Sequence, residues 1–210
     1  MNPYIENLNW RYATKKFDAT KKVSSQDLEI LKDAIQLTAS SYGLQPYKVL
    51  VIENKEIREQ LQPAAWNQAQ ITESSHLIVF ANNTKFSSIN IDSYIDNVSI
   101  TRNIKQNDLE SYSNFMKSKI NPLSSEAKEN WTAKQTYIAV GNLLSAAAFL
   151  KIDTCPLEGF EAKKIDTILG LDKLGYSTTV IVPVGYRSKE DKTQNFQKVR
   201  TPKEELFITI

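Results

Sequence analysis

The 210-residue sequence contains one cysteine, Cys155, and one histidine, His76. A single cysteine excludes an intrachain disulfide and fits a reducing compartment. Zinc and other transition-metal sites of ordinary composition need several His or Cys ligands, so no metal site is expected. His76 opens an apolar stretch, where a single hydrogen bond satisfies the ring, and we expect it to have a structural role.

Phosphate-binding and nucleophile motifs are also missing. The six glycines are scattered, and no G-x-G-x-x-G, P-loop or G-x-S-x-G pattern occurs. A protein without these groups can still catalyse a reaction when a cofactor brings the reactive atoms. If the protein is an enzyme, a bound cofactor is therefore the expected source of its chemistry.

The charge balance and the apolar runs limit the class of partner. The formal net charge is +2, from 26 basic and 24 acidic residues, whereas a dedicated nucleic-acid binder normally has a strongly basic face. The most apolar segment, near residues 137–150, contains Asn142 and Ser145 and is too short to span a bilayer. The N-terminal residues carry no apolar run with a cleavage site. We expect a cytoplasmic protein that binds neither nucleic acid nor membrane.

Hydrophobic patterning predicts a mixture of helices and strands. Apolar residues recur at helical spacing in 26–37, behind a capping box that begins at Ser24, and residues 88–120 have interrupted helical character. A longer helix is predicted over 125–150, and its second half is apolar almost all round, which is typical of a core or a subunit interface. Runs rich in β-branched and aromatic residues predict strands at 47–53, 76–82 and 176–186. Because these elements do not alternate regularly, the sequence predicts an α+β fold rather than a doubly wound sheet.

The C-terminal segment changes character from about Ser188. It is polar, yet it ends in the apolar, β-prone residues 206–210, LFITI. Such an end is poorly suited to water. We therefore expect residues 1–210 to form one domain in which residues 188–210 are an arm that docks on another surface, rather than a frayed tail.

Cationic residues cluster near both ends of the chain: Arg11, Lys15 and Lys16 at the start, and Lys198 and Arg200 at the end. Ser40 and Ser41 follow a predicted helix between them. If these side chains converge, they form a phosphate site. Taken separately, such clusters are more often solvated surface, and spacing alone does not decide between the two interpretations.

Five motifs occur in order along the chain: RYATKKFD (11–18), SSYGLQPY (40–47), PLEGF (156–160), VIVPVGY (180–186) and QKVR (197–200). Together with WTAKQTYIAVGNLL (131–144), they resemble the oxygen-insensitive NAD(P)H nitroreductase family, in its enterobacterial-type nitroreductase and dihydropteridine reductase branch. The similarity runs nearly end to end. It implies an α+β homodimer with a mostly antiparallel sheet flanked by helices, FMN at the subunit interface, and a C-terminal arm that embraces the partner.

The resemblance also implies roles for individual residues. Arg11, Lys198 and Arg200 would bind the FMN phosphate. Lys15 would lie near flavin N1 and O2, where an ammonium stabilises the negative charge that develops when the ring takes up a hydride. The residues implied to bind the cofactor are Arg11, Tyr12, Ala13, Lys15, Ser40, Ser41, Gly43, Asn67, Gln70, Pro156, Leu157, Glu158, Gly159, Lys198 and Arg200.

Subunit and ring contacts follow from the same resemblance. Ser40, Ser41 and Gly43 would come from the other subunit, and Asn67 would hydrogen-bond the edge of the flavin ring. Phe115, in the variable segment 105–120, would line the substrate pocket.

The PLEGF turn supplies the other catalytic assignments. Pro156 and Leu157 would line one face of the ring, and the N–H groups of Glu158 and Gly159 would face flavin N5 and O4. Gly159 permits a close approach because it has no Cβ. The Glu158 carboxylate is not expected to act as a general base. Without the other motifs, an ordinary turn with a solvated glutamate would be the simpler interpretation.

The implied activity is a ping-pong reaction in which NAD(P)H reduces FMN and a second substrate then accepts two electrons. Nitroaromatics, quinones and dihydropteridines are the implied acceptors. An alternative is a non-catalytic flavin-binding or redox-sensing protein of the same fold, and a third is an unrelated interaction protein with a basic tail.

The sequence departs from the family pattern at four positions. Tyr12 stands where several relatives have His, Ala13 where many have Ser, and Gly43 where Asn is common. Gln70 occupies a position often held by Lys, and one fewer cation should lower the flavin potential.

Overall fold

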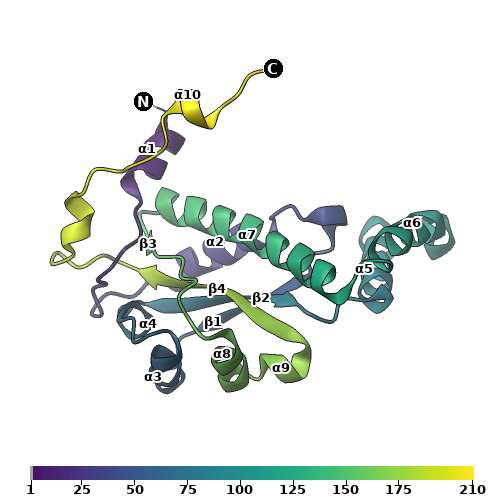
Figure 1. Cartoon of the computed structure of the whole chain (residues 1–210), viewed down its shortest axis with the longest axis horizontal. Helices are drawn as coiled ribbons and strands as arrows, with labels where there is room; N and C mark the ends of the chain where they lie inside the picture. The colour runs from purple at the N-terminus through teal and green to yellow at the C-terminus, as the bar shows by residue number, and fades with distance from the viewer. Residues whose placement is uncertain (1) are drawn as a thin grey trace.

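The computed structural model describes residues 2–210 and contains a four-stranded antiparallel sheet between two layers of helices (Figure 1). The strands are β1 (Tyr47–Ile52), β2 (His76–Asn83), β3 (Asp153–Thr154) and β4 (Tyr176–Gly185), in the order β1-β2-β4-β3. On one side lie α2 (Ser25–Gln36) and α7 (Ser125–Phe149). On the other lie α3 (Lys55–Ala64), α4 (Gln70–Glu73), α8 (Ala162–Leu169) and α9 (Leu171–Leu174). The α+β class and the three predicted strands are confirmed.

Strand β2 shows why the sheet has helices on both faces. All eight of its residues are buried. Successive side chains of a strand point to opposite faces, so Leu77 and Val79 join the core under α3 and α8, while Ile78 and Phe80 join the core under α2 and α7. A strand buried on both faces needs a continuous apolar run, as the sequence HLIVFA provides.

Helix α7 has two different apolar faces. Leu143 and Ala147 pack on the sheet and are fully buried, whereas Ile138 and Phe149 are 48% and 71% exposed. The helix therefore belongs to the core on one side, and its other apolar side is uncovered in a single chain. Among the helices of residues 2–210, none combines the length and apolar character that a membrane span requires.

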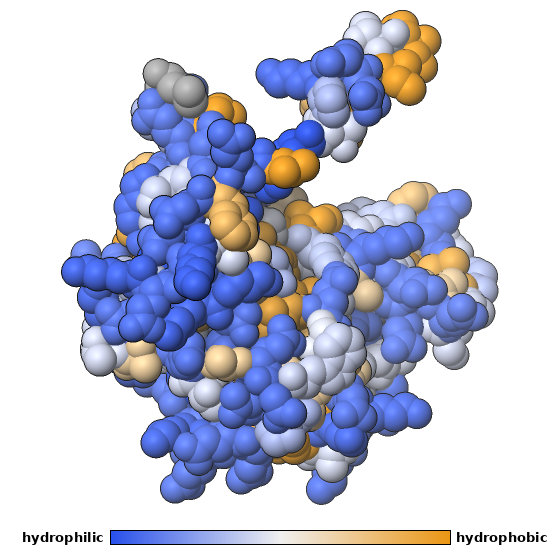
Figure 2. All heavy atoms as spheres, turned by 60° about the vertical axis from the view of Figure 1, so that its left-hand side comes forward, coloured by the Kyte–Doolittle hydropathy of each residue, from blue (hydrophilic) through white to orange (hydrophobic). Residues whose placement is uncertain are grey.

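The two ends of α7 carry separate additions (Figure 1). A hairpin of α5 (Ser88–Arg102) and α6 (Glu110–Ile120), joined through the short helix η2 (Gln106–Leu109), lies at one end. Helix α1 (Pro3–Trp10) lies at the other, beside the C-terminal segment with its short helices η3 (Lys192–Asn195) and α10 (Lys203–Leu206). Every residue from 201 to 210 is exposed, and Figure 2 shows this end projecting from the body with apolar side chains at its tip.

Two polar side chains fix the start of β2 and the short helix before it. Buried Arg58 of α3 donates to the carbonyl oxygens of Ile71 (2.7 Å), Ser74 (2.6 Å) and Ser75 (3.2 Å), so it satisfies the C-terminal end of α4. His76 lies with Nδ1 2.9 Å from the Ser75 hydroxyl and Nε2 3.3 Å from the Glu53 carboxylate. These contacts hold α4, which begins with Gln70, against the sheet.

Candidate cofactor site

Cations from the two ends of the chain meet at the C-terminal end of α1. Lys198 Nζ donates to the carbonyl oxygens of Leu8, at 2.8 Å, and of Arg11. The pKa of Arg11 is lowered by burial and then by the nearby charge of Arg200. The pKa of Lys198 is lowered by burial and then by Arg11 and Arg200. Three positive groups therefore repel one another within one small region.

This cluster fits an anionic group. Within residues 2–210, none of Arg11, Lys198 and Arg200 forms an ion pair with a carboxylate. The Nε atom of Arg11 is buried and has no hydrogen-bond partner among residues 2–210. A buried donor left unpaired costs free energy. A phosphate offers several charged acceptor oxygens, which would satisfy this donor and offset the repulsion.

The segment after α1 carries Lys15 into the same region. Ala13 bridges to Thr154 of β3, and the Thr14 amide donates to the Thr154 carbonyl at 3.4 Å. Lys15 is held through its backbone, and within residues 2–210 its ammonium forms no hydrogen bond or ion pair. Its charge is therefore available to a ligand.

Cys155 marks the point around which this region is arranged. Burial raises the pKa of its thiol, while the charges of Lys15 and Arg11 and the nearby Gln70 side chain oppose that shift. Gln70 is itself buried at the start of α4. Arg11, Lys15 and Gln70, which come from three separate segments, thus share one neighbour.

The PLEGF turn presents unpaired backbone donors. Leu157 pairs with Ile181 of β4 through two backbone hydrogen bonds of 2.8 and 3.1 Å, and its side chain is buried in the core. Within residues 2–210 the amides of Glu158 and Gly159 have no hydrogen-bond acceptor. The strand pairing thus ends just before two free N–H groups, and Pro156 is more accessible than Leu157.

Gly159 also packs closely against a protein side chain. A Cβ at this position would lie 2.7 Å from the Trp66 ring, and the Gly159 carbonyl accepts from Gln68 Nε2 at 2.8 Å. Trp66 and Asn67 both have left-handed backbone conformations with φ of 55°, which is uncommon for such residues and is often found at functional sites. Asn67 is exposed and lies in the chain between Trp66 and Gln68, which both contact this turn.

A contact from α7 supports the same turn. The Tyr137 hydroxyl donates to the Glu158 carboxylate, and burial together with this bond raises the pKa of Tyr137 to about 12. Between α7 and the turn lies a groove of about 370 Å³ that Tyr137, Gly141, Pro156 and Glu158 help to line. The carboxylate is thus engaged as an acceptor.

Ser40, Ser41, Gly43 and Phe115 do not join this cluster. The Ser41 amide donates to Gln135 Oε1 at 2.8 Å, and Gly43 lies against Tyr94 of α5. Their neighbour Tyr42 contacts Phe115 of α6 with ring centroids 6.3 Å apart. Helix α6 lies at the end of α7 opposite to α1 (Figure 1). One chain therefore holds the proposed site residues in two separate groups.

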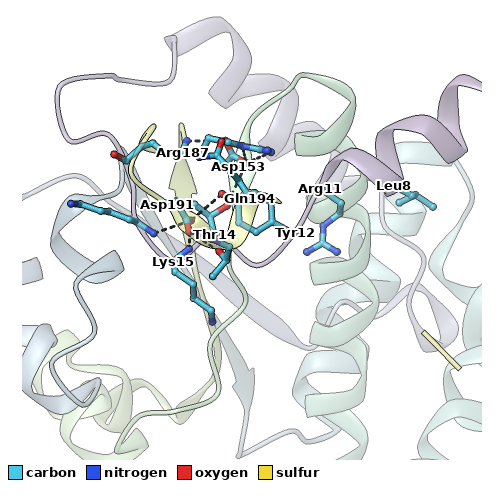
Figure 3. Close-up of polar contacts among 12 residues, drawn as sticks. Leu8, Arg11, Tyr12, Thr14, Lys15, Asp153, Arg187, Asp191 and Gln194 are labelled. Atoms are coloured by element: carbon cyan, nitrogen blue, oxygen red, sulfur yellow. Dashed lines mark hydrogen bonds and ion pairs between the residues drawn. The ribbon is translucent and has the colours of Figure 1, made fainter. Parts of the chain in front are cut away.

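Several contacts that shape the site carry no signal in the sequence patterns. Asp191 accepts hydrogen bonds from the Lys15 and Lys16 amides and from the Tyr12 hydroxyl (Figure 3). Buried Asp153 pairs with Arg187 at 2.6 Å. The Arg187 guanidinium in turn stacks on the rings of Trp10 and Tyr12, 4.2 and 4.5 Å from their centroids. These contacts fix the chain where it leaves α1.

Comparison with known proteins places this arrangement among relatives. The sequence profile that defines the Nitroreductase family matches residues 8–186. The chain belongs to the nitroreductase family. The major NAD(P)H-flavin oxidoreductase of Aliivibrio fischeri is 32% identical to this chain over 216 residues. The alignment covers 100% of this chain and 99% of the relative. A provisionally named NAD(P)H nitroreductase of Staphylococcus epidermidis is 33% identical to this chain over 219 residues. The alignment covers 98% of this chain and 96% of the relative.

Solved structures of other nitroreductases share the fold. A provisionally named nitroreductase from Exiguobacterium sibiricum, solved in complex with FMN, superposes with a TM-score of 0.83 at 21% identity, covering 99% of this chain and 97% of that chain. The family inferred from the five motifs is therefore confirmed.

Proposed function

We propose that this nitroreductase-family protein is an FMN-dependent NAD(P)H oxidoreductase. The observation that carries the proposal is the group of Arg11, Lys198 and Arg200, which lacks a carboxylate partner within residues 2–210 and includes a buried, unpaired Nε. The names of the Aliivibrio and Staphylococcus relatives and the FMN complex of the Exiguobacterium protein support the same cofactor and reductant.

The chain's own residues divide the work of holding FMN. Arg11, Lys198 and Arg200 bind the phosphate through charge-assisted hydrogen bonds. The free amides of Glu158 and Gly159 donate to the polar edge of the ring, and Lys15 supplies positive charge where charge develops. FMN, when bound, supplies the hydride chemistry. Tyr12, Ala13, Asn67, Gln70, Pro156 and Leu157 complete the proposed cofactor contacts.

The working form in this proposal is a homodimer. The group that contains Ser40, Ser41, Gly43 and Phe115 contacts the α5–α6 hairpin, so a second copy is needed to bring it to the cation cluster. The uncovered face of α7 and the exposed apolar end of the arm offer surfaces for that copy. Residues 1–210 form one domain in this proposal, and its arm, residues 188–210, embraces the partner.

The second substrate belongs to a class that accepts two electrons without help from an acid or base of the protein. The single histidine contacts Ser75 and Glu53, and the Glu158 carboxylate is occupied by Tyr137. Nitroaromatics, quinones and dihydropteridine-type compounds meet that requirement, and Phe115 is proposed to line their pocket. The lone, buried Cys155 is compatible with a cytoplasmic protein.

A purified sample separates this proposal from its alternatives. We expect a yellow protein with flavin absorption bands that oxidises NADPH or NADH when menadione or nitrofurazone is added. Flavin bands without turnover would favour the non-catalytic flavoprotein. A colourless protein that takes up no FMN would contradict the proposed function.

A further inference from the structure

Asp191 connects the two segments that carry the cations. Its Oδ2 atom accepts from the Lys15 amide at 2.8 Å, the Lys16 amide at 3.1 Å and the Tyr12 hydroxyl at 2.9 Å. Its Oδ1 atom accepts from the amide and hydroxyl of Thr193, at 3.0 and 2.6 Å. The residue is only 3% exposed. Five donors thus converge on one buried carboxylate.

The donors keep this carboxylate ionised. Burial on its own would raise the pKa of Asp191, but the hydrogen bonds from Thr193, from the Lys15 and Lys16 backbone and from Tyr12 outweigh burial and lower the pKa to about 2. Asp191 is therefore negatively charged throughout the neutral range.

Only the backbone of Lys15 is held by this contact. In Figure 3 the Lys15 side chain extends away from Asp191, and the residue's amide points toward the carboxylate. Seven positions after Asp191, Lys198 binds the carbonyl oxygens of Leu8 and Arg11. Asp191 and Lys198 thus attach the C-terminal segment to the N-terminal segment before and after Lys15, which holds the Lys15 backbone and the direction in which its side chain leaves it.

We propose that Asp191 is a positioning residue that aims the Lys15 ammonium at the bound flavin. This inference rests on the proposed function, because it concerns the effect of Lys15 on FMN. A carboxylate is required because both of its oxygens face donors. An asparagine would turn its NH₂ group toward either the Lys15–Lys16 amides or Thr193, and a donor would then face a donor.

The midpoint potential of bound FMN distinguishes positioning from simple structural support. Lys15 stabilises negative charge on the reduced ring, so a displaced Lys15 lowers the potential. Removing the negative charge of Asp191 would by itself raise the potential. A fall of the FMN potential in Asp191→Asn therefore has to come through Lys15. A general loss of stability would by itself neither raise nor lower this potential.

The test measures FMN potentials of the wild type, Asp191→Asn, Lys15→Met and the double variant by redox titration. We expect Asp191→Asn to reduce the preference for reduced over oxidised FMN about tenfold, which corresponds to about 30 mV for a two-electron couple. The double variant should have a potential equal to or above that of Lys15→Met, because without the ammonium only the direct effect of the lost carboxylate charge remains and the two falls do not add. Glu190→Gln is the control: Glu190 is the neighbouring exposed carboxylate, its side chain pairs only with Lys16 among residues 2–210, and its neutralisation should leave the potential unchanged.

A second variant covers the case in which Asp191→Asn does not fold. Thr193→Val keeps the charge of Asp191 and its bonds to the N-terminal segment and removes only the 2.6 Å hydroxyl contact. We expect a smaller fall in potential, which disappears in the Lys15→Met background. An unchanged or raised potential, or additive effects in the double variants, would overturn the role of Asp191. Failure of the wild type to bind FMN would instead contradict the proposed function.

Discussion

Replacing Arg11 with alanine should raise the dissociation constant for FMN by about 100- to 1,000-fold. Truncating one partner of a buried, charge-assisted contact costs roughly 2–5 kcal/mol, and each 1.4 kcal/mol is tenfold in affinity. Arg11 is half-buried, and its Nε has no other partner within residues 2–210. Titration of the apoprotein with FMN, followed by quenching of flavin fluorescence, gives both dissociation constants.

Riboflavin provides the internal control for this prediction, because it has the same ring and lacks the phosphate. Arg11→Ala should leave the affinity for riboflavin unchanged within about twofold, a difference well under 1 kcal/mol. Arg102→Ala, which removes an exposed arginine at the end of α5, should change neither affinity. Equal losses for FMN and riboflavin would show that Arg11 supports the fold rather than the phosphate.

Deleting residues 206–210 should convert the proposed dimer largely to monomer. Leu206, Phe207 and Ile208 are 61%, 66% and 86% exposed in the single chain, and burying a large apolar side chain contributes about 1.5–3 kcal/mol. At about 3 kcal/mol for each of two arms, the dimer dissociation constant should rise roughly 10⁴-fold. Sedimentation velocity over a dilution series measures this change.

The same deletion should also release FMN, although it leaves Lys198 and Arg200 in place. Ser40, Ser41 and Gly43 can reach the cation cluster only from a second copy in the proposed arrangement. The matched control is Glu204→Gln with Glu205→Gln, which alters the exposed polar part of the arm and should leave the dimer intact. A truncated protein that sediments as the wild type does and keeps its FMN would contradict the arm-exchanged dimer.

Periodicity predicted α2, α7 and the three longer strands because their own residues specify them, whereas α3 and α8 were not predicted. The apolar run of β2 and the helical spacing of α2 each require one local structure, and both lie within a residue or two of the expected ends. Helix α1 was not predicted: it buries no residue, and it is defined by Asn2 as N-cap and Pro3 at its start. Strand β3 has two residues, so only its pairing with β4 defines it.

The site was predictable in part because the five motifs resemble the nitroreductase family, and that resemblance pointed to Arg11, Lys15 and the PLEGF turn. The contacts of Asp191 were not predictable, since Tyr12 and Asp191 lie 179 positions apart and Asp191 stands in an ordinary polar stretch. The bond from Tyr137 to Glu158 depends likewise on how α7 crosses the turn. Long-range hydrogen bonds follow from the fold and leave no periodic pattern.

The most direct test of the account compares FMN with riboflavin as ligands of the wild-type apoprotein. Two or three charge-assisted contacts to the phosphate, at about 1.5–3 kcal/mol each, predict that FMN binds at least about 100-fold more tightly, with one FMN for each chain. Equal affinity for the two compounds, or no binding of either, would contradict a phosphate site formed by Arg11, Lys198 and Arg200.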